Sequence, residues 1–444
     1  MTYIPNSEKD IRHMLDTLGL KGIEDITSPI PGKFIVKDDP SDDGLTQSEV
    51  EEHFNKIASK NRKYDSVFLG SGAYDHYIPP TVGELIGRQE FYTAYTPYQA
   101  EVSQGTLQGI FEYQTYMAEI TGMDVSNASM YDGATSCAEA IVMAVASTRQ
   151  RKVLVDRYVH PEYLEVVRTY MNPIGVEVVL FDASPFEFDT GAFEKAWSDE
   201  YAAFVISSPN FCGSIMDYAS ITDKVHADKR LVIHVIQEIM SLSILKSPGE
   251  YGADIACGEA QSFGMPLSYG GPYLGFLACK KDQMRKMPGR IAGQTKDSDG
   301  NIVYTLTLTA REQHIRRELA TSNICSNHGL CAMTASVYLS TLGQKGLRSC
   351  GLSNIEKSHM LQEKISVIDG FDSVKEQYFF NEFVVKTGKD RNEIKSELEK
   401  AGILSFRPLG DISEKLKDCY LVCVTEKNSM EEIDKFVSIL RSMK

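Results

Sequence analysis

Residues 152–181, KVLVDRYVHPEYLEVVRTYMNPIGVEVVLF, determine the class of the fold. Residues 152–156 and 176–181 are short apolar runs, each of a length typical of a buried strand. Between them, residues 161–170 have the pattern of a helix that begins at a proline. Strands joined by helices in this way imply a mostly parallel sheet that is covered on both faces.

The same alternation continues toward the C-terminus. Asp299-Gly300 is a two-residue hairpin signal, and residues 302–308 after it alternate between apolar and polar side chains as a strand does. The predicted fold class is therefore α/β. The further elements predicted in this region are strands at 202–207, 231–236, 254–258 and 274–279 and a helix at 218–226.

Composition divides the chain into three parts. Residues 1–70 are charged and carry helical patterns at 9–18 and 47–60, which is typical of an arm that packs on another surface. Residues 71–330 are expected to form one large domain, and residues 331–444 a small C-terminal α+β domain. The strands predicted in this last part are residues 379–386 and 419–424, and the final helix is expected to begin with a capping box of Ser429 and Glu432.

The charge of the chain excludes several classes of function. Its 444 residues include 46 lysines and arginines and 61 aspartates and glutamates, which gives a formal net charge of −15. An acidic chain without a basic block is a poor binder of nucleic acid and is repelled by anionic membranes. The apolar runs are too short to span a bilayer, and the N-terminus lacks the pattern of a secretory or transit signal. We therefore expect a cytoplasmic protein.

Cysteine and histidine give no indication of a disulfide framework or a metal site. The nine cysteines include no Cys-x-x-Cys pair. Cys419 and Cys423 are closest in sequence, but along one face of a strand they would lie about 13 Å apart, too far for a disulfide. We expect reduced thiols. The histidines show no spacing typical of metal ligands, so no metal site is expected.

The segment Asp132-Gly133-Ala134-Thr135-Ser136 ends a predicted strand and opens a predicted helix at 137–147. Free amides, small side chains and hydroxyls at a helix N-terminus can bind a phosphate group. The same residues can instead serve only to cap the helix, and Ser136 with Glu139 has the spacing of a capping box. The motif alone leaves both interpretations open.

Two further features lie at predicted strand ends, which is where ligands bind in parallel sheets. His160 is followed by a proline and could stack on a cofactor ring, or it could be a hydrogen-bonded structural residue. The glycine-rich segment 258–272 permits tight backbone turns. It either surrounds a ligand or is a plain turn.

Four aromatic side chains lie within residues 91–98. Tyrosine combines contact area with a polar hydroxyl, so this segment suits an interface or a substrate channel, or it is simply a half-buried surface segment. The charged run 311–317 looks helical and is either a solvated face or part of a site. The small polar residues 321–326 either enter a cavity or cap the next helix.

Taken in this order, the motifs resemble the glycine cleavage system P-protein family, the glycine decarboxylases. The resemblance covers nearly the whole chain and is closest to the α chain, subunit 1, of the form that is split into two chains. The most specific match is residues 90–99, EFYTAYTPYQ. The other matching strings are residues 3–6, 70–79, 103–105, 127–135, 248–254, 311–317 and 320–325.

The resemblance implies the fold of type I pyridoxal-phosphate (PLP) enzymes. It also implies glycine decarboxylation, with the aminomethyl group passed to the lipoyl arm of the H-protein. In the cofactor-bearing chain of the family, a lysine in a His-Lys-Thr-Phe stretch holds PLP as a Schiff base. The corresponding residues here are Ala260-Gln261-Ser262-Phe263, so Gln261 stands at the lysine position. An amide nitrogen is not nucleophilic, and the chain is expected to lack the covalent anchor.

A partner β chain, subunit 2, is therefore expected to carry the PLP in an α2β2 assembly. The residues expected to form a vestigial cofactor site in this chain are Gly133, Thr135, His160 and Gln261. Since type I PLP sites are commonly built at a subunit interface, the chain could also line the partner's substrate or lipoyl channel. Tyr95 is the first candidate for this role, because it is central in the tyrosine motif; the others are Tyr92, Tyr98, Glu101, Arg316 and Asn323.

Two positions depart from the family pattern. Leu319 stands where the family usually has lysine, and Gln237-Glu238 replaces the usual Ala-Asp after the strand 231–236. Two other functions also remain open from the sequence. The chain could be a self-sufficient PLP enzyme that uses another lysine, or a catalytically silent binding or regulatory protein.

Overall fold

The computed structural model describes residues 6–35, 44–320, 322–324, 328–374 and 377–443. The chain divides into two compact units, residues 1–63 and residues 64–444. The first unit contains α1 (Glu8–Leu18) and α2 (Gln47–Ala58), each opened by a capping box, so both predicted helices are confirmed. Among its residues α1 buries only Leu15 and α2 buries none, and Phe54 remains 63% exposed. Caps, and not packing within the unit, therefore hold these helix ends.

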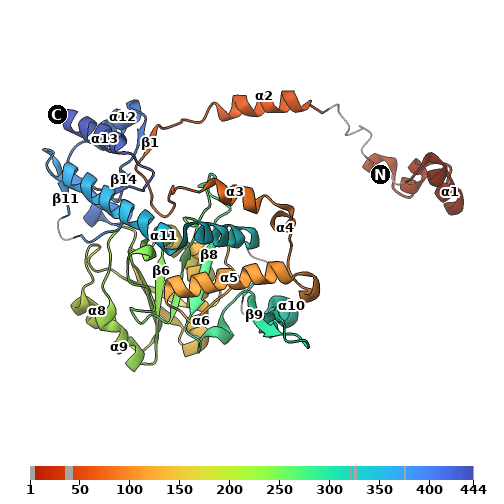
Figure 1. Ribbon diagram of the computed structural model, residues 1–444, viewed down its shortest axis with the longest axis horizontal. Coiled ribbons are helices and arrows are strands. Elements are labelled where there is room, and N and C mark those ends of the chain that lie inside the picture. Colours follow the sequence, from red (N-terminus) through yellow and green to blue (C-terminus); the bar gives the residue numbers. More distant parts are fainter. Residues whose placement is uncertain (1–5, 36–43, 321, 325–327, 375–376, 444) are drawn as a thin grey trace. The chain divides into compact units, whose positions relative to one another are not determined.

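The second unit is built on a seven-stranded sheet in the order β2-β8-β7-β6-β5-β3-β4 (Figure 1). The five strands from β7 to β4 run parallel, whereas β8 and β2 are antiparallel to their neighbours. The predicted, mostly parallel sheet is thus confirmed. Its strands are β2 (Val125–Ser126), β3 (Lys152–Asp156), β4 (Glu177–Phe181), β5 (Tyr201–Ser207), β6 (Leu231–Ile236), β7 (Ile255–Glu259) and β8 (Gly275–Cys279).

Helices cover both faces of this sheet. On β5, Phe204 and Ile206 belong to a core that also includes side chains of α5, α8, α9 and α11. Ala203 and Val205 point the other way, into a core shared with α6 and α7, as the alternation of side chains along a strand requires. These helices are α5 (Gln104–Thr121), α6 (Gly133–Thr148), α7 (Pro161–Met171), α8 (Thr190–Ala196), α9 (Ala219–Ala227) and α11 (Gly329–Ser366), which is broken at Gly343.

The C-terminal part has a four-stranded antiparallel sheet in the order β11-β12-β15-β14. A strand near the start of the unit, β1 (Ser66–Val67), pairs in parallel with β13 (Ile403–Leu404). The capping box of Ser429 and Glu432 is confirmed. The remaining elements are β11 (Phe371–Ser373), β12 (Glu382–Thr387), β14 (Arg407–Pro408), β15 (Cys419–Cys423), α12 (Arg391–Lys400) and α13 (Met430–Ser442). The strand predicted from residue 379 therefore begins at Glu382.

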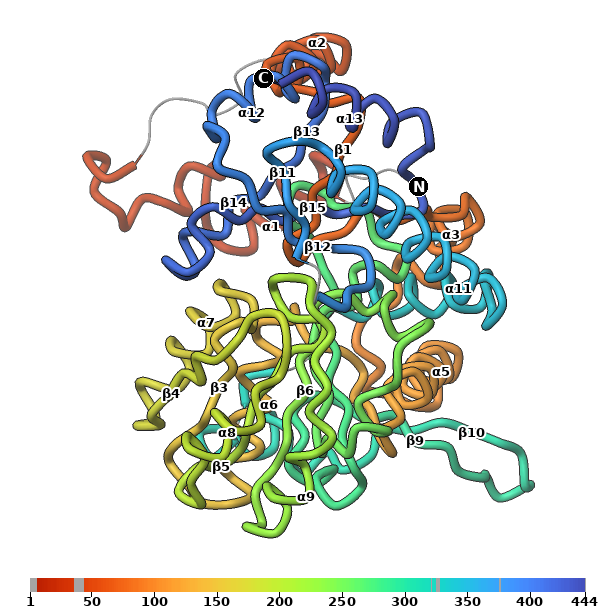
Figure 2. Tube along the Cα trace, turned by 90° about the vertical axis from the view of Figure 1, so that its left-hand side faces the viewer, coloured from red at the N-terminus to blue at the C-terminus, as the bar shows by residue number. Residues whose placement is uncertain are grey.

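Two local predictions were wrong. The hairpin of β9 (Ile291–Lys296) and β10 (Ile302–Thr307) has a loop over residues 297–301 instead of a two-residue turn. The Asp297 carboxylate accepts the backbone N–H groups of Asp299 and Asn301, which stabilises the longer loop. Figure 2 shows this hairpin extending away from the large sheet. The run 311–317 is not one helix, because α10 (Gln313–Arg316) ends where Arg317 takes a left-handed conformation.

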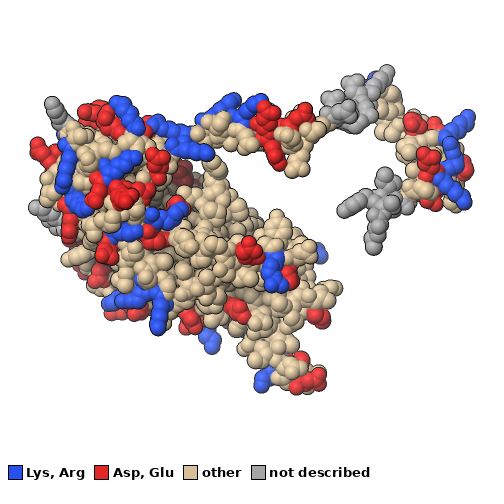
Figure 3. All heavy atoms as spheres, turned by 45° about the horizontal axis from the view of Figure 1, so that its top comes forward, with Lys and Arg blue, Asp and Glu red and all other residues tan. Residues whose placement is uncertain are grey.

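The surface carries mixed charge. Figure 3 shows acidic and basic side chains interspersed over the face that it displays. Within the described ranges, no helix combines the length and the apolar character that a membrane crossing needs. The same residues contain no group of three or more histidines, cysteines or carboxylates that could hold a metal ion.

Candidate functional site

The structure brings the four positions of the expected vestigial cofactor site to one edge of the large sheet. Gly133 and Thr135 open α6, His160 precedes α7 after β3, and Gln261 follows β7. Two of these elements, β3 and β7, are parallel strands that end here, and the carboxyl ends of parallel strands are the usual place for a ligand in this architecture. The contacts at this edge therefore decide whether this chain can hold a cofactor.

The amides at the N-terminus of α6 are bound by carboxylates of the same chain. Asp132 caps the helix, and its Oδ1 accepts the Thr135 N–H at 2.7 Å. The Gly133 N–H donates to Glu259 Oε2 at 3.0 Å. A Cβ atom added to Gly133 would come within 2.0 Å of the Tyr163 hydroxyl, so this end of the helix is also sterically filled.

The predicted capping box of Ser136 and Glu139 is wrong. The helix begins one turn earlier, because Asp132 takes the N-cap position with Thr135 as its reciprocal partner. The Ser136 hydroxyl donates to the Asp132 carbonyl at 2.7 Å, as a residue inside the first turn does. Glu139 is then free for another role, and its Oε1 accepts the Ser322 hydroxyl at 2.8 Å.

Glu259, the last residue of β7, accepts hydrogen bonds from three backbone N–H groups. Its Oε1 accepts the backbone N–H groups of Leu274 at 2.8 Å and Gln261 at 3.1 Å, while Oε2 accepts that of Gly133. Burial raises the pKa of Glu259 to about 7, although the three N–H donors oppose this shift. The carboxyl group therefore takes the position at the α6 N-terminus that an external anion would otherwise occupy.

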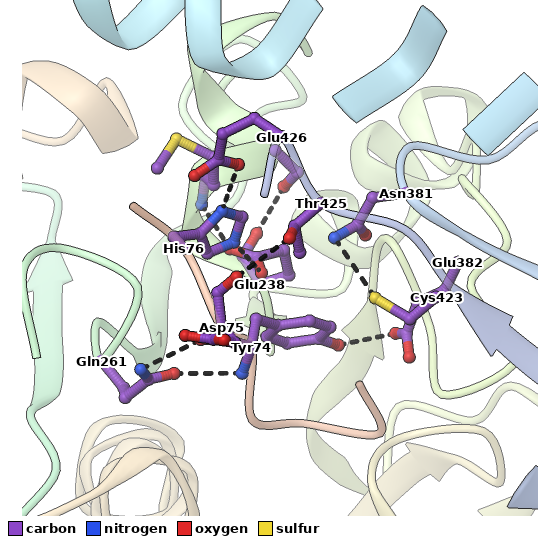
Figure 4. A network of polar contacts seen from close by, with 12 residues as sticks. Tyr74, Asp75, His76, Glu238, Gln261, Asn381, Glu382, Cys423, Thr425 and Glu426 are labelled. Atoms are coloured by element: carbon purple, nitrogen blue, oxygen red, sulfur yellow. Dashed lines mark hydrogen bonds and ion pairs between the residues drawn. The ribbon is translucent and has the colours of Figure 1, made fainter. Parts of the chain in front are cut away.

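Gln261 is 2% exposed, and both ends of its amide are hydrogen-bonded (Figure 4). Nε2 donates to the carbonyl oxygens of Tyr74 at 3.1 Å and Met265 at 2.5 Å. Oε1 accepts the Tyr74 N–H at 3.1 Å. The side chain thus pairs with the Tyr74 backbone as a neighbouring strand would, and it holds residues 70–77 against the turn after β7.

Residues 70–77 also lie against His160. Gly72 has φ of +96°, and a Cβ atom there would come within 2.7 Å of His160 Cδ2, so the backbone touches the imidazole. His160 Nε2 lies 3.0 Å from the Ser71 carbonyl oxygen, and Nδ1 accepts the Glu162 N–H at 3.2 Å. These contacts favour the neutral tautomer with the proton on Nε2, and burial lowers the pKa of His160. Both ring nitrogens of His160 are thus bound by the backbone of the chain itself.

Glu382 of β12 also binds residues 70–77. Its Oε1 accepts the Ser71 N–H at 2.7 Å, and its Oε2 accepts the Tyr74 hydroxyl at 2.6 Å. Burial raises the pKa of Glu382 to about 7, against the effect of these two donors. One short segment is therefore bound at once to the large sheet and to the C-terminal sheet.

His76 forms a second buried link between the two sheets. Its Nε2 lies 3.0 Å from Glu238 Oε2, and its Nδ1 lies 2.8 Å from Glu426 Oε2. Burial alone would lower the pKa of His76, but the charges and hydrogen bonds of the two carboxylates outweigh this and raise it to about 10. The imidazole is consequently a cation held between two anions at neutral pH (Figure 4).

The departure Gln237-Glu238 from the family pattern lies in this network. Glu238 supplies the carboxylate for His76 and also accepts the Met240 N–H at 2.7 Å. Gln237 donates from Nε2 to the Ser207 hydroxyl at 3.0 Å. Both side chains are buried, so the substitution comes with its own hydrogen-bond partners.

The tyrosine segment lies elsewhere and is exposed. The exposed fractions of Tyr92, Tyr95 and Tyr98 are 68%, 81% and 57%. Tyr95 lines a cavity of about 200 Å³ together with Arg290 and the first turn of α11. The Arg290 guanidinium lies 4.9 Å from the Tyr98 ring centre and 3.3 Å from Glu312. This cavity has mostly apolar walls and one buried guanidinium, which is paired with the carboxylate of Glu312.

The other expected channel residues do not share this cavity. Glu101 is exposed in a single 3₁₀ turn of residues 100–102. Arg316 lines a pocket beside α6, and Asn323 lines a neighbouring pocket that contains Tyr170. Leu319, the second departure from the family pattern, is 70% exposed at the pocket of Arg316.

Sequence reasoning missed most of the buried network. Tyr74 and His76 lie in a matching string, residues 70–79, but the string gave no role for either side chain. Glu382 and Glu426 had no local signal, because they lie more than 300 residues along the chain from their partners. The one available clue was the departure at Glu238, which indicated altered contacts at that strand end.

Replacing Gln261 with leucine should destabilise the isolated chain. The Tyr74 N–H and the carbonyl oxygens of Tyr74 and Met265 would stay buried without partners, so we expect a loss of about 2–4 kcal/mol in the free energy of unfolding. Urea unfolding followed by circular dichroism measures it. The control Gln108→Leu changes an exposed glutamine of α5 and should shift the value by less than about 0.5 kcal/mol. An equal loss of unfolding free energy in the two variants would show that the Gln261 amide does not contribute to stability.

His76 should make the free energy of unfolding depend on pH in the alkaline range. A folded-state pKa raised to about 10 stabilises the fold fully below the unfolded value of about 6.5, and the contribution is lost as pH rises through 10. The stability difference between wild type and His76→Gln should therefore shrink between pH 7 and pH 10. Melting temperatures across this range provide the test, with the exposed His53→Gln as control. A pH-independent difference would mean that His76 is neutral.

Comparison with known proteins agrees with this architecture. A family model described as the glycine cleavage system P-protein matches residues 1–440. A probable glycine dehydrogenase (decarboxylating) subunit 1 of Carboxydothermus hydrogenoformans is 46% identical over 99% of this chain and 99% of its own length. The protein of the same description from Moorella thermoacetica is 45% identical over the full length of both.

Solved structures show the same fold. A crystal structure of glycine decarboxylase (P-protein) of the glycine cleavage system, in inhibitor-bound form, has a TM-score of 0.90 at 37% identity and covers 99% of both chains. A C-DES variant with glycine linked covalently to its PLP cofactor has a TM-score of 0.62 at 14% identity, over 87% of this chain and 98% of that one. The latter likeness shows the type I PLP fold alone. By sequence and by structure, the chain belongs to the glycine cleavage system P-protein family, in which it corresponds along its length to proteins called subunit 1 of glycine dehydrogenase (decarboxylating).

Proposed function

We propose that this chain is the α chain of a two-chain glycine decarboxylase and does not itself carry the cofactor. Together with a β chain, it decarboxylates glycine and passes the aminomethyl group to the lipoyl arm of an H-protein. The naming of the relatives as subunit 1 supports a second subunit. The observation that carries the proposal is Gln261, a fully hydrogen-bonded amide at the position where the family has its Schiff-base lysine.

The residues at this sheet edge do not fit a covalently held PLP. A Schiff base needs a primary amine, and a bound phosphate needs free N–H groups. Here the amine is replaced by an amide, and Glu259 and Asp132 accept the N–H groups of Gly133 and Thr135 in the first turn of α6. The PLP that the family uses would then be held by the partner chain, where it would supply an electron sink for decarboxylation.

Other lysines near this turn in sequence do not replace the missing one. In the register of β7 with β8, Ile255 pairs with Cys279 and Glu259 pairs with Gly275. Lys280 and Lys281 therefore lie at the opposite end of these strands from Gln261. Lys280 Nζ donates to the Gly252 carbonyl and to Asp254. This arrangement disfavours a self-sufficient PLP enzyme.

The role of the chain in this proposal is structural and positional. It would form an α2β2 assembly and place the tyrosine segment at the rim of the partner's site. The cavity beside Tyr95 supports this role, since the tyrosine hydroxyl can orient a substrate by a hydrogen bond. The cytoplasm is proposed as the place of action from the acidic composition of the chain and from the free thiols of its described cysteines.

Activity should require both chains. We expect neither purified chain alone to exchange the glycine carboxyl group with bicarbonate, and we expect the mixture to do so in the presence of PLP. Borohydride reduction of the mixture should label a lysine of the β chain only. Stoichiometric pyridoxyl labelling of one lysine in this chain would contradict the proposal. Full activity of the β chain alone would refute an essential role for the α chain.

Tyr95→Phe should lower activity without affecting the fold. Because the side chain is 81% exposed, loss of its hydroxyl should leave the melting temperature unchanged. If it serves the partner's site, exchange by the assembled complex should fall roughly tenfold, about 1.4 kcal/mol of transition-state stabilisation. Tyr269→Phe, at a fully exposed position, is the matched control. An unchanged exchange rate would remove Tyr95 from the site.

A further inference from the structure

A small basic pocket lies on the side of α6, away from the vestigial cofactor site. Its volume is about 150 Å³. One wall is the α6 face that carries Glu139 and Val142, and the other walls come from the 3₁₀ turn of residues 284–286 and from residues 309–319. Four cations line it: Arg285, Lys286, Arg311 and Arg316. None of the four positions of the vestigial cofactor site lines this pocket.

These cations have no acidic partner of their own. Among the described residues, none of the four forms an ion pair within 4.0 Å, although other surface cations do, such as Arg407 with Asp411 at 2.7 Å. Lys286 donates to the Ser147 hydroxyl at 2.9 Å, and Arg316 donates to the Ala310 carbonyl at 3.2 Å. Four cations without an ion pair around one hollow are unexpected in a chain of net charge −15, which has acidic side chains in excess.

Arg311 is the best-defined donor. Its Nε donates to the Leu308 carbonyl at 3.0 Å and its Nη2 to the Gly289 carbonyl at 2.9 Å, which fixes the guanidinium plane. The third nitrogen, Nη1, is buried and lacks a hydrogen-bond partner in the described part of the chain. Burial lowers the pKa of Arg311. A buried charged donor without an acceptor costs free energy, and the same guanidinium group belongs to a residue that lines the pocket.

We propose that this pocket binds one compact oxyanion, a phosphate-like group that is either free or the end of a small molecule. A fixed guanidinium and converging cations suit such a group, because planar N–H donors match its oxygens. The volume of about 150 Å³ accommodates a phosphate-sized group. Two carboxyl groups oppose the binding of an anion. Glu139 lies in the wall, where burial raises its pKa to about 7, and the charge of Glu312 acts on Arg311.

Isothermal titration of the full chain with sodium sulfate, at constant ionic strength in chloride buffer, tests the proposal. We expect saturable binding of one sulfate per chain. Arg311→Gln should weaken it at least tenfold. Because Arg311 also holds two carbonyl groups, the exposed rim variant Arg285→Gln is measured as well and should weaken binding at least threefold without changing the melting temperature. The control Arg348→Gln removes an equal charge from the exposed face of α11 and should leave the affinity unchanged.

The absence of sulfate binding, or equal affinity in all three variants, would overturn the proposal. Further titrations distinguish the source of the anion. Glycerol 3-phosphate binding at least tenfold more tightly than inorganic phosphate would assign the pocket to a phosphorylated small molecule, and equal affinities would assign it to the free anion. A glutamate hexapeptide is titrated as well. The small-anion proposal would be overturned in favour of an acidic protein partner if the hexapeptide bound more tightly than every small anion and if Arg285→Gln and Arg311→Gln abolished this tighter binding.

Discussion

The hydrogen bonds of the Gln261 amide are the interaction on which the buried polar network of this protein depends. The amide connects the turn after β7 to the backbone of Tyr74, 187 residues earlier in the chain. Both polar ends of the side chain and both polar groups of the Tyr74 backbone are buried, so each hydrogen bond replaces one that water would otherwise make. Because Tyr74 is fixed in this way, residues 70–77 lie where they can reach His160, Glu382 and Glu426.

The buried side chains around Gln261 and Tyr74 are polar, and they find their partners within the chain. Glu259, Glu382 and Glu238 are all less than 5% exposed, and a buried charge is tolerated only with partners. Each of them has such partners: backbone N–H groups for Glu259, the Tyr74 hydroxyl for Glu382 and the His76 cation for Glu238. The edge of the sheet where this architecture usually binds a ligand is thus occupied by interactions within the chain.

A fold of this kind can persist while the residues at the ends of its strands change. The α/β architecture is independent of any one site residue, since function depends on the site and not on the fold. Here Gln261, which the resemblance places at the Schiff-base lysine position, is a structural hydrogen-bonding residue, and the Gly133 N–H at the start of α6 donates to the carboxylate of Glu259. The exposed features, namely the tyrosine segment and the basic pocket beside α6, remain available for contacts with other molecules.

The sequence by itself determined the mostly parallel sheet and its main strands, and the family resemblance predicted that position 261 lacks the Schiff-base lysine. Apolar runs such as residues 152–156 predict buried strands because burial of a short strand depends on local composition, and an amide at position 261 excludes a Schiff base whatever surrounds it. Only the tertiary structure decided that Gln261 binds Tyr74, that His76 lies between Glu238 and Glu426, and that four cations from residues 285–316 surround one pocket. Hydrogen bonds and ion pairs depend on which distant segments meet, and the pattern of a single segment carries no information about its partner.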